Sequence, residues 1–309
     1  MFLLCTIAIG LLVDASPASA RAHHRHQAQQ QPDAALSAKA AAAKPLPKDA
    51  TPVSAAKPGD PGTANLGGIN VNYWEPGVVG LRPLIIFSHS YGGCSTQASF
   101  LMIELAKQGW LVVAPDHRDA QCGKTGGKEK QLTDPALWYD NTFIQRGEEI
   151  RKVYRILHSD GKWRTRIDWS RVAIVGHSLG GYTALALAGG MPNWRLDGIT
   201  AVVALSPYCG ALSNKGTLDA INVPVMYVGG NKDEISSGMV SGKNGCYDRT
   251  SGFASYVEFE KVGHMAFTDS NNTARAPMTE YLKTFLASAF AGNAVKFVRV
   301  AGVSDLRQK

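Results

Sequence analysis

Four residues of this sequence have side chains suited to nucleophilic catalysis, and each stands just after an apolar run: Ser178, Asp233, Glu234 and His264. A seryl hydroxyl is too weakly acidic to attack a carbonyl carbon unaided, so a histidine must accept its proton. A carboxylate must in turn hold that imidazole in the accepting tautomer. This set predicts acyl chemistry through a covalent intermediate, with Ser178 as nucleophile, His264 as acid and base, and Asp233 or Glu234 as the orienting carboxylate.

The serine lies in the sequence Gly-His-Ser-Leu-Gly-Gly at residues 176–181, between an apolar run and a helical pattern. Residues 172–175 are typical of a buried strand, and residues 182–188 are small and apolar, as in a helix packed close to a sheet. A sharp turn here would strain the serine, and a Cβ at Gly176 or Gly180 would collide with the neighbouring strand and helix. This context favours a nucleophile elbow over a glycine-rich turn without a catalytic role.

Apolar runs alternate with helical patterns along the chain. Strands are predicted at residues 69–74, 83–87, 110–114, 172–175, 199–205, 223–228 and 255–259, and helices at residues 96–108, 148–157 and 182–188. The alternation predicts an α/β fold with a mostly parallel central sheet and helices on both faces. Only a short segment separates Leu205 from Val223, so we expect no large helical cap. Trp138, in a long loop at residues 120–143, either walls the active site or pins this loop to the domain.

Composition and patterning predict one folded domain preceded by extra sequence. The chain has 309 residues, of which 45% are hydrophobic and 18% charged, as in a soluble globular protein. Residues 2–13 are apolar and residues 18–20 read Ala-Ser-Ala, which predicts a signal peptide at residues 1–20, although no basic residue precedes the run and an uncleaved anchor is the alternative. Residues 21–62 are rich in Ala, Gln, Pro and Lys and predict a disordered tether. Residues 63–309 remain as the catalytic domain.

The net charge of +7 does not indicate a nucleic-acid partner. Part of this charge belongs to the tether, and the folded part has no basic stripe interleaved with aromatic residues. His23, His24 and His26 of the tether have no cysteine or carboxylate at ligand spacing, so we expect no metal site there. The sequence predicts a secreted or periplasmic monomer that needs no cofactor, acts on an ester substrate and has no integral membrane segment once mature.

Besides Cys5, the chain has four cysteines: Cys94, Cys122, Cys209 and Cys246. Exported proteins oxidise such even sets. The first two follow strands that should be neighbours, and the last two lie in loops after adjacent strands. Of the three possible pairings we therefore favour Cys94–Cys122 with Cys209–Cys246. The alternative of a zinc site is weak because no C-x-x-C pair is present.

Three segments carry a resemblance to a known family: residues 87–93 (Phe-Ser-His-Ser-Tyr-Gly-Gly), residues 176–183 (Gly-His-Ser-Leu-Gly-Gly-Tyr-Thr) and residues 263–264 (Gly-His). Over about residues 70–290 the chain resembles α/β-hydrolases of the dienelactone hydrolase and platelet-activating-factor acetylhydrolase-like group. In layout it is more distantly similar to cutinase-like polyester hydrolases. Dienelactone hydrolases proper use a cysteine nucleophile, so a serine at this position favours the serine esterase branch.

The resemblance implies which residues form the site. The order Ser178, Asp233, His264 is that of α/β-hydrolases, and the family's spacing favours Asp233 over Glu234. Two backbone N–H groups would stabilise the oxyanion, and by position these are expected from Tyr91 and Leu179, although Ser90 stands where the family usually has glycine. The other histidines of the folded part are expected only to form local hydrogen bonds or to face solvent: His89, His117, His158 and His177.

The sequence therefore predicts a secreted serine hydrolase that cleaves carboxylic esters through an acyl-enzyme. Without a cap the cleft should be open, walled by the loops at residues 120–143 and 235–251, and should favour short acyl chains. The alternatives are a phospholipid acetylhydrolase of the platelet-activating-factor type, a cutinase-like polyester hydrolase and an acyltransferase. A non-catalytic binding protein is disfavoured because all three triad positions are occupied.

Overall fold

The computed structural model describes residues 59–122 and 132–309. The predicted signal peptide, the tether up to residue 58 and its three histidines lie outside these residues, as do residues 123–131 of the long loop. The first strand of the described chain starts at Gly62.

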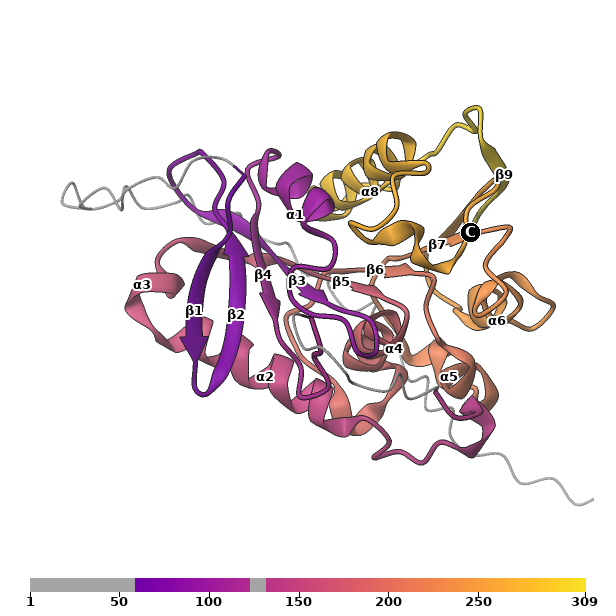
Figure 1. The fold of residues 1–309 in the computed structure, drawn as a ribbon, viewed down its shortest axis with the longest axis horizontal. Coiled ribbons are helices and arrows are strands. Elements are labelled where there is room, and N and C mark those ends of the chain that lie inside the picture. Colours follow the sequence, from indigo (N-terminus) through magenta and orange to yellow (C-terminus); the bar gives the residue numbers. More distant parts are fainter. Residues whose placement is uncertain (1–58, 123–131) are drawn as a thin grey trace, which may run out of the picture. The chain divides into compact units, whose positions relative to one another are not determined.

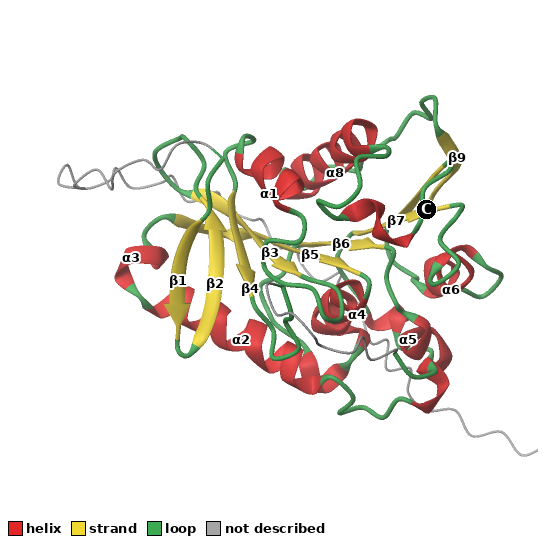
Figure 2. Cartoon of the chain, in the orientation of Figure 1, coloured by secondary structure: helices red, strands yellow, loops and turns green. Residues whose placement is uncertain are grey.

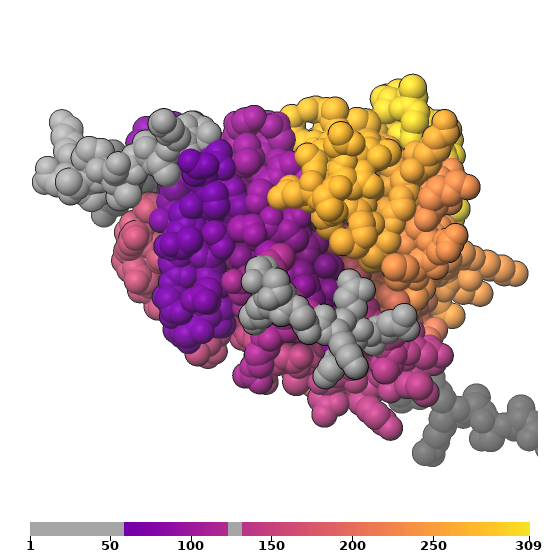
Figure 3. Space-filling view, in the orientation of Figure 1, coloured from indigo at the N-terminus to yellow at the C-terminus, as the bar shows by residue number. Residues whose placement is uncertain are grey.

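A nine-stranded sheet forms the centre of the described chain, in the order β1-β2-β4-β3-β5-β6-β7-β8-β9. The strands are β1 (Gly62–Leu66), β2 (Ile69–Trp74), β3 (Arg82–Ser88), β4 (Leu111–Pro115), β5 (Ile167–His177), β6 (Ala201–Leu205), β7 (Val225–Gly230), β8 (Ala254–Phe259) and β9 (Val303–Gln308). Strands β4 to β8 are parallel in this order, and β1, β2 and β9 pair antiparallel at the two edges. Figure 3 shows the indigo surface of the first described residues and the yellow surface of the C-terminal residues at opposite sides of the view. The predicted α/β-hydrolase fold is confirmed.

Helices cover both faces of this sheet (Figure 1). They are α1 (Ser99–Ala106), α2 (Ile144–Ser159), α3 (Gly161–Arg164), α4 (Leu179–Leu185), α5 (Gly210–Lys215), α6 (Ser237–Ser241), α7 (Cys246–Arg249) and α8 (Arg275–Phe290), with the short helical segments η1 (Pro135–Leu137), η2 (Ala186–Gly190), η3 (Pro192–Trp194), η4 (Leu218–Ala220) and η5 (His264–Phe267). Figure 2 shows α1 and α8 on one side of the sheet and α2, α4 and α5 on the other.

Two apolar cores lie on the two faces because successive side chains of a strand point in opposite directions. In β3, Leu84 and Ile86 pack in the core beneath α2 and α4, whereas Ile85 and Phe87 pack in the core beneath α1 and α8. All four side chains are fully buried. A strand covered on both faces needs an unbroken apolar run, which is why the central strands were recognisable from the sequence.

The sequence patterns did not predict the edge strands β1 and β9 or the long helix α8. Only Val303 of β9 is buried, and its polar side chains Asp305 and Arg307 pair with each other at 2.6 Å. An edge strand with one partner and a solvated face carries no apolar run, so its sequence does not differ from that of a loop.

The segment between β6 and β7 contains only α5, with six residues, and η4, with three. This agrees with the expected lack of a large cap within the described chain. Trp138 of the long loop is 5% exposed, its indole N–H donates to the Thr133 hydroxyl at 2.9 Å, and its ring packs against Tyr182 and Tyr208. Trp138 therefore pins this loop to the domain.

Two disulfides tie loops that follow neighbouring parallel strands. Cys94, after β3, is bonded to Cys122, after β4, and Cys209, after β6, is bonded to Cys246 at the start of α7. Both bonds have the pairing that the strand order predicted. They cross-link the edge of the sheet from which the functional loops leave.

We expect the double variant Cys209→Ala/Cys246→Ala to lose about 2–4 kcal/mol of unfolding free energy, because the bond restricts a long loop of the unfolded chain. Urea unfolding of the purified protein measures this loss. Non-reducing peptide mapping of the wild-type protein is the control for the pairing. Equal midpoints for the variant and the oxidised wild type would contradict the expectation.

Candidate active site

Ser178 lies at the turn between β5 and α4, with φ 56° and ψ −116°. A residue with a side chain adopts such a conformation at a cost of about 1–3 kcal/mol, so the surroundings must enforce it. An added Cβ on Gly176 would lie 2.1 Å from the carbonyl oxygen of Gly180, and one on Gly180 would lie 2.0 Å from that of Ser88. The turn is possible only with glycine at both positions, as predicted. It presses α4 against the end of β3.

Three side chains from separate loops meet at this turn. The Ser178 Oγ lies 2.9 Å from Nε2 of His264, which stands in η5 after β8. The Nδ1 of the same ring lies 3.0 and 3.1 Å from the two carboxylate oxygens of Asp233, which follows β7. Asp233 is 2% exposed, whereas its neighbour Glu234 faces solvent. The carboxylate that contacts the histidine is therefore the one that the family's spacing favoured.

The hydrogen bonds of Asp233 determine what the histidine can do. Burial raises the pKa of this carboxyl, but the hydrogen bond and charge of His264, together with the Ser236 hydroxyl at 2.6 Å, outweigh burial and hold the pKa well below its usual value. An ionised carboxylate only accepts hydrogen bonds, so Nδ1 carries the proton and Nε2 has a free lone pair. Nε2 can therefore accept the proton of Ser178.

His177, next to the nucleophile, links this site to the loop after β3. Its Nδ1 accepts from the side-chain amide of Gln97 at 2.8 Å, so its Nε2–H donates to the backbone carbonyl of His264 at 2.9 Å. The Gln97 oxygen accepts from both the N–H and the hydroxyl of Ser90, at 3.0 and 2.8 Å. One amide side chain thus connects the loop of Ser90 to the backbone of His264.

The loop after β3 carries the predicted oxyanion donor Tyr91, and α4 begins with the other, Leu179. In the described ranges, neither backbone N–H donates a hydrogen bond to a protein acceptor. Gly92 of this loop has a positive φ, whereas Ser90 does not. A serine can therefore stand at position 90, where the family usually has glycine, without backbone strain. The N–H groups of Tyr91 and Leu179 thus have no acceptor within the described protein.

Apolar side chains next to the catalytic loops face solvent. Ile235, two residues after Asp233, and Met265, directly after His264, are each 50% exposed. Leu137 and Tyr139 of the long loop are also exposed. Ile235 and Met265 thus expose apolar surface next to Asp233 and His264 in the sequence.

The sequence patterns missed a buried ionic group beside the loop after β3. Arg146 of α2 is fully buried and forms a two-pronged ion pair with Asp119, at 3.0 and 2.7 Å. Asp119 stands in the loop after β4. Functional carboxylates often lie at the ends of parallel strands, so this position could have indicated Asp119 from the sequence. Arg146 gave no such indication, because a lone arginine in a helix usually faces water.

Of the two remaining histidines, His117 is buried and has partners that are distant in sequence, whereas His158 faces solvent. The Nε2 atom of His117 lies 2.8 Å from the Ser88 hydroxyl oxygen, and its Nδ1 atom lies 2.8 Å from a carboxylate oxygen of Glu149. His158 is exposed and packs against Trp169. Within the described ranges there is no cluster of His, Cys, Asp or Glu arranged to hold a metal ion. None of the helices in this part of the chain is long and apolar enough to cross a bilayer.

Comparison with known families gives two matches, each over less than half of the chain. Residues 142–291 match the PET hydrolase-like family, and residues 74–145 match platelet-activating factor acetylhydrolase, isoform II. Together the two matches include the loop after β3, the turn at Ser178, Asp233 and His264.

Individual relatives agree with these matches. The chain is 30% identical over 144 residues to the platelet-activating factor acetylhydrolase of Gallus gallus, covering 33% of this chain and 34% of that enzyme. It is 27% identical over 205 residues to cutinase est2 of Thermobifida alba, covering 65% of this chain and 59% of the cutinase. Cutinase cut1 of Thermobifida fusca is 24% identical over 204 residues, with 65% and 56% coverage. The chain thus spans less than two thirds of the length of these relatives.

Three buried histidines should make the fold sensitive to acid. Burial lowers the pKa of His89 to about 4 and that of His177 to about 3, and it holds the pKa of His117 well below its usual value. Below about pH 6.5 the unfolded chain binds protons at these residues and the folded chain does not. The free energy of unfolding therefore decreases as the pH is lowered. Glu149 opposes this, because burial raises its pKa to about 7 and the folded chain then holds an extra proton.

We expect a net uptake of about two protons on unfolding between pH 6 and 5, which lowers the unfolding free energy by about 3 kcal/mol per pH unit. Urea unfolding at pH 5, 6, 7 and 8 measures how the unfolding free energy changes with pH. His117→Gln, as the matched variant, should make this slope smaller by about one proton. An unfolding free energy that stays constant from pH 7 to 5 would contradict the assignment of neutral buried histidines.

Proposed function

Because the chain is an α/β-hydrolase, we propose that it is a serine hydrolase that cleaves carboxylic esters through an acyl-enzyme. The observation that carries this proposal is the continuous hydrogen-bonded series from Ser178 through His264 to Asp233 at a strained strand-to-helix turn. The same three residue types in the same roles define the serine hydrolase triad. The similarity to cutinases and platelet-activating factor acetylhydrolases supports an ester as the substrate.

In the acylation step, His264 Nε2 takes the hydroxyl proton of Ser178 while Oγ bonds to the ester carbonyl carbon. The carbonyl oxygen becomes negative and accepts hydrogen bonds from the N–H groups of Tyr91 and Leu179. His264 then gives its proton to the leaving alkoxide, and the carbon–oxygen bond breaks to release an alcohol. Asp233 stabilises the imidazolium throughout without taking its proton.

In the deacylation step, water attacks the acyl-enzyme carbonyl and gives a proton to His264 Nε2. The oxyanion forms again in the same place and collapses, and His264 returns the proton to the Ser178 oxygen as it leaves. The products are a carboxylic acid and the free enzyme. An alcohol in place of water would give transesterification with the same residues, so the ratio of acid to new ester measures any acyltransferase activity.

We further propose that residues 1–20 are a signal peptide, that the chain from residue 21 up to the first strand at Gly62 forms a tether and that the catalytic domain works outside the cytoplasm. Both disulfides support export, because thiols stay reduced in the cytoplasm. The proposed substrates are esters of short acyl chains, since the short segment between β6 and β7 cannot form a large cap. Two further candidates are supported by similarity: a phospholipid acetylhydrolase and a polyester hydrolase.

We expect Ser178→Ala and His264→Ala to abolish nearly all turnover of p-nitrophenyl acetate, and Asp233→Asn to reduce kcat by about 10³–10⁴-fold as the imidazole loses its tautomer. Glu234→Gln is the matched control and should retain full activity, because Glu234 faces solvent beside Asp233. A fluorophosphonate should label Ser178 alone. Full activity of Ser178→Ala, or a label on another residue, would disprove the assignment.

We expect kcat/KM for p-nitrophenyl esters to be highest at short acyl chains, about C2 to C6, and to show no activation at a lipid interface. A buried methylene contributes about 0.8 kcal/mol to binding where a pocket encloses it, and an open cleft encloses few. The same assay on a phospholipid with a short sn-2 acyl chain and on a polyester film separates the three substrate classes. Activity that rises to long chains, or appears only above the critical micelle concentration, would contradict the open cleft.

A further inference from the structure

The peptide unit that joins Ser90 to Tyr91 is held by its oxygen. The Ser90 carbonyl oxygen lies 3.0 Å from Nη2 of Arg146, 2.7 Å from Nδ1 of His89 and 3.0 Å from the N–H of Gly93. The N–H of the same unit belongs to Tyr91 and donates to no protein acceptor within the described ranges. The peptide unit is thus fixed through its oxygen, while its N–H has no partner in the described protein.

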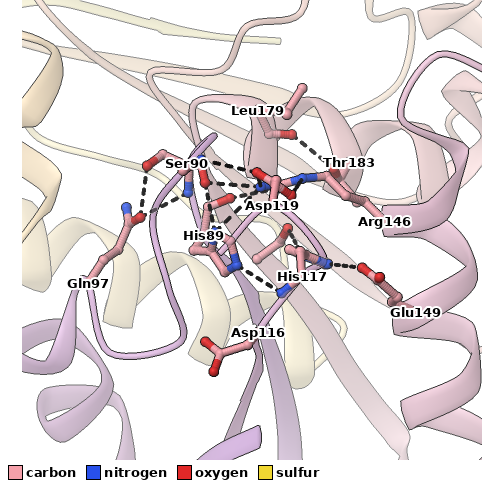
Figure 4. A network of polar contacts seen from close by, with 12 residues as sticks. His89, Ser90, Gln97, Asp116, His117, Asp119, Arg146, Glu149, Leu179 and Thr183 are labelled. Atoms are coloured by element: carbon pink, nitrogen blue, oxygen red, sulfur yellow. Dashed lines mark hydrogen bonds and ion pairs between the residues drawn. The ribbon is translucent and has the colours of Figure 1, made fainter. Parts of the chain in front are cut away.

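Arg146 can hold this oxygen because its own position is fixed. Its Nε and Nη2 donate to the two oxygens of Asp119, and its Nη1 donates to the carbonyl of His89 at 2.7 Å (Figure 4). Asp119 in turn accepts from the N–H of Gly92 at 3.1 Å. Burial and the charge of Arg146 act in opposite directions on Asp119, and the result is a lowered pKa that keeps this carboxylate ionised. A planar guanidinium with a two-pronged partner has little freedom to rotate.

The tautomer of His89 follows from its neighbours. Its Nε2 lies 3.0 Å from the backbone N–H of His117, which can only donate, so Nε2 is the acceptor. The proton of the neutral ring is therefore on Nδ1, which donates to the Ser90 carbonyl. Both Arg146 and His89 thus act on the same oxygen as donors.

Holding the oxygen determines where the N–H points. The described chain has no cis peptide bond, and in a trans unit the C=O and N–H point in opposite directions. The loop lies against the elbow, because a Cβ on Gly180 would be 2.0 Å from the carbonyl oxygen of Ser88 and 2.7 Å from that of His89. A cation on the carbonyl oxygen also polarises the amide and strengthens its N–H as a donor.

We propose that Arg146 is a positioning residue of the oxyanion hole, which fixes and polarises the Tyr91 N–H by binding the carbonyl oxygen of Ser90. This inference rests on the proposed esterase function. Negative charge on the substrate oxygen develops only in the transition state, so loss of Arg146 should lower kcat and leave KM nearly unchanged. Removal of one oxyanion donor commonly costs about 10²–10³-fold in kcat, and a misdirected donor should approach the lower value.

The test compares Arg146→Lys with wild type on p-nitrophenyl acetate. Lysine keeps the buried charge beside Asp119 but cannot bind two carbonyls and a carboxylate in one plane. We expect kcat to fall by about 10²-fold with KM within threefold. The affinity for a trifluoromethyl ketone, whose adduct with Ser178 carries an oxyanion, should fall by the same factor as kcat/KM. Arg155→Lys, on the exposed face of α2, is the matched control and should change none of these quantities.

A second variant tests the inference if the Arg146→Lys protein does not fold. Arg146→Ala should regain part of its kcat when ethylguanidinium is added, because the added cation can occupy the space beside Asp119 and Ser90. Asp119→Asn, which leaves Arg146 in place but loosens it, should give a smaller loss of kcat in the same direction.

Several results would overturn the inference. One is a folded Arg146→Lys protein with kcat within threefold of wild type. Another is a variant whose ketone affinity is unchanged while KM rises, since that would show a role in substrate binding. If all three variants unfold, or if ethylguanidinium restores folding without activity, Arg146 is only structural. A wild-type protein that hydrolyses no ester would instead refute the proposed function and leave the geometry of Arg146 unaffected.

Discussion

The site depends on one close approach of two backbones. The first turn of α4 passes so near the end of β3 that no side chain fits at Gly180, and the strained φ of Ser178 follows from the same sharp turn. This contact joins the two segments that carry the predicted oxyanion donors, because Tyr91 follows β3 and Leu179 begins α4. The strain at Ser178 is maintained by the surrounding sheet, whose central strands are buried on both faces. A large, well-packed core thus supports a turn that would be unfavourable in isolation.

The histidines around this turn differ in burial and role. His264 is the histidine whose second nitrogen faces the nucleophile, and its side chain is 11% exposed. His89, His117 and His177 are buried, and burial holds each of them neutral near pH 7. Neutral imidazoles can act as one donor and one acceptor at once, so they connect loops without adding charge. The positive charge of Arg146 contacts the carbonyl groups of His89 and Ser90 in the loop after β3, and Asp119 neutralises it.

Much of this architecture was predictable because it depends on local sequence. The unbroken apolar runs identified the central strands, the spacing of glycines around Ser178 identified the elbow, and the strand order predicted both disulfides. The carboxylate and the histidine were found because loops at one edge of a parallel sheet converge. Their assignment needed the family's spacing as well, since Asp233 and Glu234 are adjacent and equivalent as residue types.

The parts that were not predictable depend on contacts between distant residues. Arg146 lies 56 residues after Ser90 in the chain, and Gln97 lies 80 residues before His177. No periodicity links such pairs, and a buried arginine contradicts the usual preference of that residue for water. The edge strand β9 was missed for a different reason. It pairs with β8 on one side only, and most of its side chains are partly exposed, so its sequence has no apolar run.

The most direct test is a crystal structure of the protein after reaction with an alkyl p-nitrophenyl phosphonate, which mimics the tetrahedral intermediate. We predict phosphorus bonded to Ser178 Oγ, with the phosphoryl oxygen about 3 Å from the backbone nitrogens of both Tyr91 and Leu179. The Ser90 carbonyl should still bind Arg146. A phosphoryl oxygen that points to solvent or to other donors, or a phosphonate on a residue other than Ser178, would contradict the account.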